Sequence, residues 1–94
     1  MTGASDDVTN RLTVANDGES PLEFVLEPWG EIYELPAGES FEIVAHGPPG
    51  GFEVTHQAGR IVVWGWTGTT VDLLRDNVEI APGSGPRGRV PPMP

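Results

Sequence analysis

The sequence predicts an all-β fold, a single small antiparallel β-sandwich of seven to eight short strands. Three observations support this prediction. Apolar residues alternate with polar ones in short runs, as expected of strands that bury one face. Turn-forming residues separate these runs at intervals of about 8–12 residues. No segment shows the apolar period of about 3.6 residues that marks an amphipathic helix.

The clearest strands lie in the stretch 21–46, which contains three extended runs at residues 22–27, 31–35 and 40–45. Apolar side chains occupy alternate positions of these runs, and glutamates stand between them. Pro-Trp-Gly and Pro-Ala-Gly separate the runs, because proline presets φ and glycine permits the positive φ that a chain reversal requires. We therefore expect strands with one buried and one water-facing side.

Five further runs complete the predicted fold, at residues 11–15, 52–56, 60–66, 69–74 and 78–80. Turns are expected at Asn-Asp-Gly (16–18) and at Asp-Asn (76–77), because these residues tolerate left-handed backbone. The run 60–66 is the most apolar and β-branched of all. It is therefore expected to be a central strand covered on both faces.

The run 52–56 has two possible partners. In a hairpin with 40–45, placing Ala45 opposite Phe52 and Ile43 opposite Val54 gathers the apolar residues on one face. In the alternative, the Pro- and Gly-rich loop 47–51 carries the chain to the opposite sheet. Both arrangements are compatible with a sandwich.

The length of 94 residues allows one domain with one modest core. We expect the sandwich to occupy residues 1–81, with residues 1–7 flexible. Residues 82–94 should form a disordered tail, because they are rich in proline and glycine and have little to bury. The amino terminus carries acids where a secretory signal has bases, and no apolar run approaches the length of a membrane span. These features favour a soluble, cytoplasmic protein.

The composition narrows the chemistry. There is no cysteine, so disulfides, thiolate nucleophiles and zinc–sulfur sites are excluded. Fourteen acidic residues outnumber five basic ones, for a formal net charge of −9. A negative field repels phosphate backbones and suits a basic protein partner or a basic ligand. We expect a protein partner, no nucleic acid, no membrane and no cofactor; the oligomeric state stays open.

A resemblance adds to this prediction. The stretch 33–44, with the letters Y-x-L-P-A-G-E-S-F-x-I-V, resembles the strand–turn–strand edge of bacterial immunoglobulin-like and cupredoxin-like domains. The resemblance implies a β-sandwich. The blue-copper site of cupredoxins includes a cysteine ligand, which this chain lacks, so no electron-transfer site is implied.

His46 and His56 are the candidate metal ligands, since they are the two histidines of the chain. In the hairpin register they lie roughly 13 Å apart, at about 3.3 Å per residue, which is too far for one ion. The sequence therefore predicts a loop position for His46 and a partly buried His56, and no metal site. No serine stands in a nucleophile elbow, so we assign no catalytic residue.

The aromatic residues offer a candidate binding surface. Trp64 and Trp66 are expected on one face of a strand, in the core, whereas Trp29 stands beside a turn glycine and is hard to bury. If the aromatic residues near one edge converge, glutamates would surround them in a patch suited to a protein partner, a cationic ligand or a sugar ring. The predicted patch consists of Trp29, Tyr33, Trp66, Glu27, Glu31 and Glu34.

These observations lead to three hypotheses. The leading one is a non-catalytic acidic β-sandwich interaction module, or accessory subunit, that binds another protein through the Trp29 turn and the glutamate faces, with the basic tail as a second contact. The first alternative is a small-ligand or carbohydrate-binding domain that stacks its ligand on Trp29 and Trp66. The second is a metal-binding protein or enzyme that uses His46 and His56.

Overall fold

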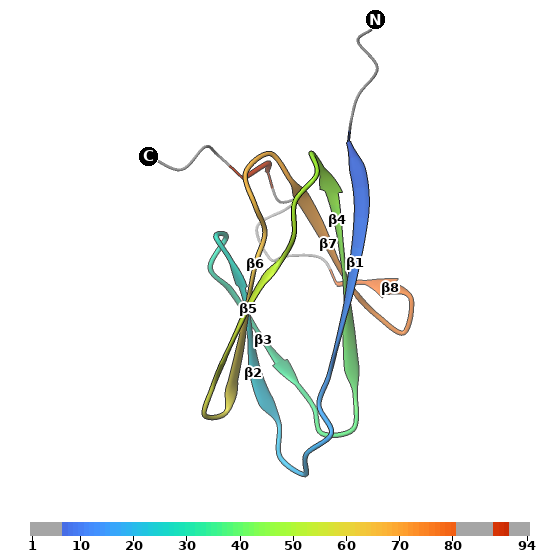
Figure 1. Ribbon diagram of the computed structural model, residues 1–94. Coiled ribbons are helices and arrows are strands. Elements are labelled where there is room, and N and C mark those ends of the chain that lie inside the picture. The colour runs from blue at the N-terminus through green and yellow to red at the C-terminus, as the bar shows by residue number, and fades with distance from the viewer. Residues whose placement is uncertain (1–6, 81–87, 91–94) are drawn as a thin grey trace, which may run out of the picture.

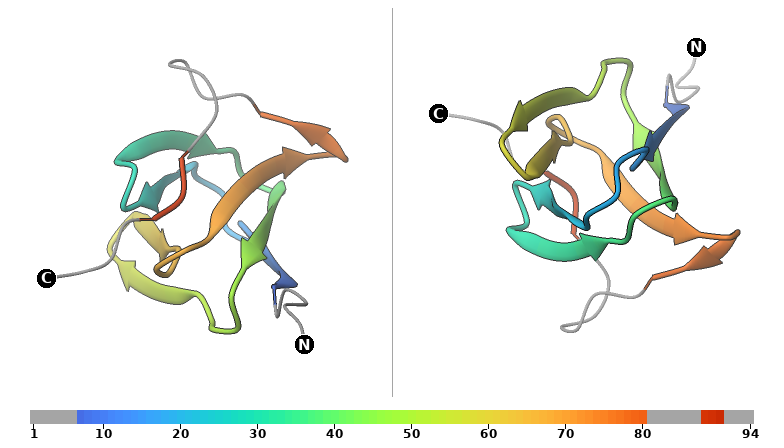
Figure 2. Two further views of the ribbon diagram at one scale, coloured as in Figure 1. Left: turned by 90° about the horizontal axis from the view of Figure 1, so that it is seen from above. Right: turned by 90° about the horizontal axis from the view of Figure 1, so that it is seen from below.

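The computed structural model describes residues 7–80 and 88–90 and contains eight strands in two four-stranded sheets (Figure 1). The strands in chain order are β1 (Val8–Ala15), β2 (Leu22–Glu27), β3 (Glu31–Leu35), β4 (Ser40–Gly47), β5 (Glu53–Gln57), β6 (Arg60–Trp64), β7 (Thr70–Arg75) and β8 (Val78–Glu79). Sheet A has the order β1-β4-β7-β8, and sheet B has the order β3-β2-β6-β5. Viewed from above and below, the sheets form two facing layers (Figure 2). The predicted all-β sandwich is confirmed.

One structural finding concerns helices that could cross a membrane. Within residues 7–80 and 88–90, the structure has no helix that combines the length and the apolar character needed to cross a bilayer.

Each predicted run forms a strand, but some bounds differ. β1 begins at Val8 rather than at residue 11, because it pairs with β4 along its whole length, from Val8 opposite Gly47 to Ala15 opposite Ser40. β4 accordingly extends through His46, which lies in a strand and not in the predicted loop. β6 ends at Trp64, so Trp66 belongs to the following turn and not to the strand.

The core lies between the sheets and follows the predicted alternation. Phe24 and Tyr33 of sheet B meet Phe41 of sheet A, with ring centroids 5.2 Å (Phe24–Phe41) and 6.3 Å (Tyr33–Phe41) apart. Burying a large apolar side chain completely stabilises a fold by about 1.5–3 kcal/mol, so these contacts hold the two layers together. The largest fully buried side chains are Phe24, Phe41, Leu26, Leu35, Ile43, Leu73, Val63 and Thr69.

One strand pairing departs from the antiparallel pattern. β2 and β6 are parallel, with Val25 opposite Val62, whereas the other five pairings are antiparallel. Parallel neighbours need a long crossover between them. Here the crossover consists of β3, β4 in the opposite sheet, and β5.

The loop between β4 and β5 crosses from sheet A to sheet B, so the hairpin that places Ala45 opposite Phe52 is wrong and the alternative is correct. The loop wraps around one indole. Trp66 donates its Nε1–H to the carbonyl of Pro48 at 2.8 Å and packs edge-on against Phe52 at a centroid distance of 5.4 Å. Gly50 lies directly on the same ring, since an added Cβ would lie 2.3 Å from Trp66 Nε1. These contacts direct the chain into sheet B.

Both predicted polar turns are present, but one is formed by backbone conformation and the other by side-chain hydrogen bonds. Asp76 and Asn77 have φ values of 53° and 64°, and Arg75 pairs with Val78 across them. Such a two-residue reversal with positive φ matches the twist of a hairpin. Asn16 acts instead through its side chain, which is buried, donates to the carbonyls of Ser20 (2.8 Å) and Leu35 (3.0 Å), and accepts from the N–H of Gly18 (3.0 Å).

Residues 88–90 differ from the expected disordered tail. Val90 is only 4% exposed and exchanges backbone hydrogen bonds with Gly68 and Thr69, each 2.9 Å long. The Nε1–H of Trp29 donates to the carbonyl of Gly88 at 3.0 Å. Val90 supplies the apolar side chain that this part of the chain was expected to lack. The remainder of the predicted tail, and residues 1–6, lie outside the described residues.

Candidate functional site

Strand alternation divides sheet B into a core face and an outer face. Directly opposite residues of paired strands share a face, so the register identifies the outward members. Because Phe24, Leu26, Ile61 and Val63 are buried in the core, the intervening residues point outward. We call these the outer face of sheet B; they are Glu23, Val25, Glu27, Ile32, Glu34, Glu53, Thr55, Gln57, Arg60, Val62 and Trp64.

An aliphatic row crosses the middle of this face. Val25 lies opposite Ile32 on one side and opposite Val62 on the other. Val25 is only 7% exposed although it points away from the core, whereas Ile32 at the end of the row is 63% exposed. Because removing apolar surface from water is favourable in free energy, a partner that covers the exposed end of this row would be stabilised there.

Carboxylates border this row. Glu23 pairs with Arg60 at 2.5 Å. Glu27, Glu34 and Glu53 make no ion pair or side-chain hydrogen bond with the described part of the chain. Their charges therefore add up to a negative potential over the outer face.

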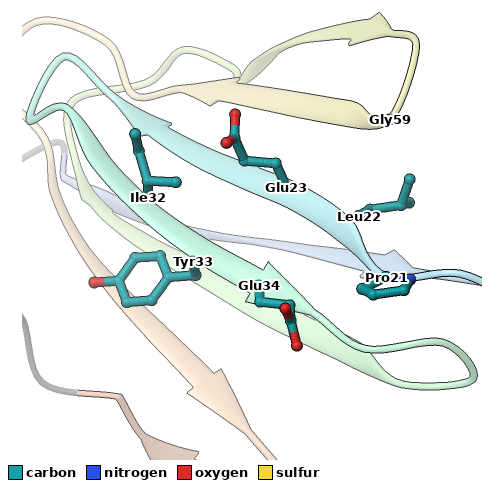
Figure 3. A pocket seen from close by; sticks show the side chains of 7 residues that line it. All are labelled: Pro21, Leu22, Glu23, Ile32, Tyr33, Glu34 and Gly59. Atoms are coloured by element: carbon teal, nitrogen blue, oxygen red, sulfur yellow. The ribbon is translucent and has the colours of Figure 1, made fainter.

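A hollow of about 430 Å³ opens at the β3 edge of the outer face (Figure 3). Ile32 lines this hollow together with Glu34, also on β3, and Glu23, on the neighbouring strand β2. Its full lining is Pro21, Leu22, Glu23, Ile32, Tyr33, Glu34 and Gly59. The apolar row and the acidic border thus meet in one concave part of the surface.

The three tryptophans have different surroundings. Trp29 and Trp66 are half-buried, pack against the core and donate their indole N–H groups to backbone carbonyls. Trp64 is half-buried on the outer face, and its indole N–H has no acceptor among residues 7–80 and 88–90. Trp64 is therefore the tryptophan of sheet B that is available to a partner. The sequence interpretation had placed it in the core.

The six residues of the predicted aromatic patch do not gather at one edge. Glu27 and Glu34 lie on the outer face of sheet B. Tyr33 and Glu31 share the core-facing side of β3 and hydrogen-bond to each other, and the Tyr33 ring lies 6.4 Å from that of Phe24.

The two remaining members of the predicted patch, Trp29 and Trp66, lie on either side of Gly65. An added Cβ at Gly65 would lie 3.0 Å from Trp29 Cη2, which shows how closely that ring packs on the backbone. Trp66 follows Gly65 directly and is enclosed by the β4–β5 loop. They pack beside the same glycine but are separate from Tyr33 and Glu31.

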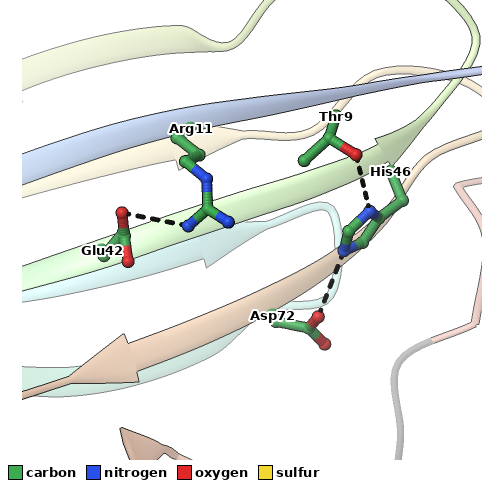
Figure 4. A network of polar contacts seen from close by, with 5 residues as sticks. All are labelled: Thr9, Arg11, Glu42, His46 and Asp72. Atoms are coloured by element: carbon green, nitrogen blue, oxygen red, sulfur yellow. Dashed lines mark hydrogen bonds and ion pairs between the residues drawn. The ribbon is translucent and has the colours of Figure 1, made fainter. Parts of the chain in front are cut away.

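The outer face of sheet A carries paired polar groups (Figure 4). Arg11 Nη1 lies 3.3 Å from Glu42 Oε2. His46 lies between two partners, with Nδ1 3.2 Å from Thr9 Oγ1 and Nε2 3.4 Å from Asp72 Oδ2. The order hydroxyl, imidazole, carboxylate occurs in hydrolases, where it works in a water-excluded site. Here the side chains of His46 and Asp72 are 48% and 47% exposed, which favours a polar surface contact over catalysis.

The two histidines lie on different sheets. His46 is on β4 of sheet A, and His56 is on β5 of sheet B, where it lines a groove of about 220 Å³ with Leu12, Val54 and Ile61. Within the described part of the chain, no three His, Cys, Asp or Glu side chains form a group that could hold a metal ion.

Comparison with protein-family models, with curated proteins and with solved structures gives no match to this chain. The surface features that bear on function are therefore the outer face of sheet B and Trp64.

Proposed function

We propose that this protein is a non-catalytic acidic β-sandwich module that binds a basic surface of another protein through the outer face of sheet B. The observation that carries the proposal is the row of Ile32, Val25 and Val62, which has an exposed end and is bordered by carboxylates that make no ion pair within the described residues. Protein interfaces combine an apolar centre with a polar rim, and complementary potentials speed association and select partners.

The surroundings of Trp29 and Trp66, the two tryptophans that the carbohydrate-binding alternative uses, support the interaction module over that alternative. Stacking on a sugar needs indole faces that are free to turn toward the ligand. Trp29 is packed on Gly65 and hydrogen-bonded to Gly88, and Trp66 is packed on Gly50 and hydrogen-bonded to Pro48. The metal or enzyme alternative draws little support either, because its two histidines belong to different sheets.

Two further expectations belong to this proposal. An immunoglobulin-like or cupredoxin-like kinship, at the level of the fold, is supported by the two four-stranded sheets and by the turn at residues 36–38, which leads from β3 in sheet B to β4 in sheet A. We also propose a cytoplasmic location, since a chain without cysteine has no disulfide that needs an oxidising compartment.

The test is a comparison of two matched lysine variants in affinity capture from the cells that make the protein. Ile32, on the outer face of sheet B, and Val78, on β8 of sheet A, are similarly exposed, at 63% and 67%. Ile32→Lys removes apolar contact and adds a charge that repels a basic partner, so it should weaken capture at least about tenfold. Val78→Lys should leave capture unchanged.

The captured protein should also be basic at its contact surface, and its retention should fall as salt is raised, since exposed charges are screened. Equal capture by both variants, or retention that is insensitive to salt, would refute the proposed face. Circular dichroism of both variants shows whether each retains its fold.

A further inference from the structure

We propose that the hollow beside Trp64 binds an organic cation, namely the guanidinium or ammonium group of a basic side chain on the docked protein. The inference rests on the proposed function, because it names what the partner inserts next to the outer face of sheet B. This Trp64 hollow has a volume of about 240 Å³ and is lined mainly by Pro28, Glu53, Trp64, Gly65, Trp66 and Val90.

A glycine separates the two tryptophans that line the hollow. Gly65 contributes only backbone between Trp64 and Trp66. The side on which a Cβ would stand is closed by Trp29 and Thr69, at 3.0 Å and 3.2 Å from the ideal Cβ position. Any other residue at position 65 would push against the Trp29 ring. The packing of Trp29 and Thr69 therefore favours glycine at position 65.

An aromatic ring and a carboxylate stand next to each other at the hollow. Glu53 on β5 is directly opposite Trp64 on β6, and such pairs have their Cβ atoms about 4.5–5.5 Å apart. The Glu53 carboxylate has no ion pair or hydrogen bond within the described residues, and the Trp64 indole N–H has no acceptor there. Among the residues that the structure describes, no arginine or histidine lines the hollow. A cation can lie over the π face of the indole ring and pair with the neighbouring carboxylate.

The volume of the hollow suits a single side chain better than a drug-sized ligand. Sites for drug-sized ligands and cofactors usually have volumes of about 300–1,000 Å³. Trp64 and Glu53 also belong to the outer face, one row away from Val62, so a protein docked on that face reaches the hollow directly.

The experiment follows the three indole N–H resonances by NMR while a short peptide is added to the full chain. The peptide, acetyl-Gly-Arg-Gly-amide, is compared with the same peptide containing citrulline, which has a similar shape and no charge. We expect the arginine peptide to shift the Trp64 resonance, identified by its loss in Trp64→Phe, and the citrulline peptide to leave it in place. Glu53→Gln should weaken arginine binding about two- to fivefold, as expected for an exposed charge pair.

Glu19→Gln is the matched control, because Glu19 is an exposed carboxylate that makes no ion pair within the described residues and lies between β1 and β2, outside the lining of the hollow. It should leave arginine binding unchanged. Tetramethylammonium tests whether the hollow prefers a free small-molecule cation to the side chain of a protein. If it binds more tightly than the arginine peptide, the assignment to a protein side chain is overturned.

A Trp64 resonance that responds to neither cation would overturn the inference, and the Ile32→Lys result would still decide the docking face. Conversely, arginine binding at Trp64 combined with equal capture by Ile32→Lys and Val78→Lys would keep the cation site and refute the docking face. The two failures are therefore distinguishable.

Discussion

The outer faces of the two sheets are built from the same strand geometry, but their polar groups are used differently. On sheet A, Arg11 contacts Glu42 and His46 contacts Asp72, so each of these carboxylates has a basic side chain beside it. On sheet B, one glutamate is paired with Arg60, and Glu27, Glu34 and Glu53 stand without a partner in the described structure. Within the described residues, these carboxylates of sheet A have basic neighbours and three glutamates of sheet B have none, which is why we propose sheet B as the docking face.

The residues at the centres of the two faces show the same contrast. Val44 of sheet A is 5% exposed and has Arg11 and Asp72 as its direct neighbours across the strands. Val25 of sheet B is 7% exposed and has Ile32 and Val62 in the corresponding positions. An apolar centre with an acidic border is thus peculiar to sheet B. A docking face is recognised by which groups lack partners, not by charge alone.

The largest effect is expected where the outer face of sheet B joins the core, at Gly65. Gly65→Ala places a Cβ 3.0 Å from Trp29 and 3.2 Å from Thr69, so both must shift. Overpacking of this kind costs about 1–3 kcal/mol in the free energy of unfolding, which denaturant titration measures. Gly51→Ala is the control, because an added Cβ there has no neighbour within 4 Å. Equal stability of the two variants would show that Trp29 does not pack tightly on Gly65.

An intermediate effect should separate the two central valines. Val25→Thr puts a hydroxyl between Ile32 and Val62, where no polar partner stands opposite, and should cost about 1–3 kcal/mol. Val44→Thr puts the same group between Arg11 and Asp72, whose charged side chains offer hydrogen bonds, and should cost about 1 kcal/mol less. Denaturant unfolding of both variants measures the difference. Identical costs would contradict the contrast between the two faces.

The smallest effect concerns the Arg–Glu pair that each face contains. Arg11–Glu42 and Arg60–Glu23 are both exposed, so each should contribute only about 0.2–1 kcal/mol to stability. Double-mutant cycles with glutamine replacements give the two coupling energies, and both should fall as salt is added. A coupling that persists in high salt would mean that the pair is more enclosed than its exposure indicates.

Local patterns predicted the class of fold and the positions of the strands. Alternation in residues 22–27 and 40–45 identifies strands with one buried face, since the side-chain period of a strand is two. The Asp-Asn pair at 76–77 identifies a reversal, since both residues adopt positive φ in the structure. These signals depend on neighbours along the chain, and so they can be read from the sequence.

The candidate site depended on contacts between distant segments. In Ile-Val-Val-Trp at 61–64 every residue is apolar, so alternation alone does not tell which residues face the core. Pairing with β2 and β5 turns Ile61 and Val63 inward and leaves Trp64 outward. The packing of Gly50 on Trp66 likewise sends β5 into sheet B, and no turn signal in the loop specifies that choice. The pairing of strands in the tertiary structure therefore decided which residues form the outer face of sheet B. The sequence could not decide this, because the same strand pattern can pair with more than one neighbouring strand.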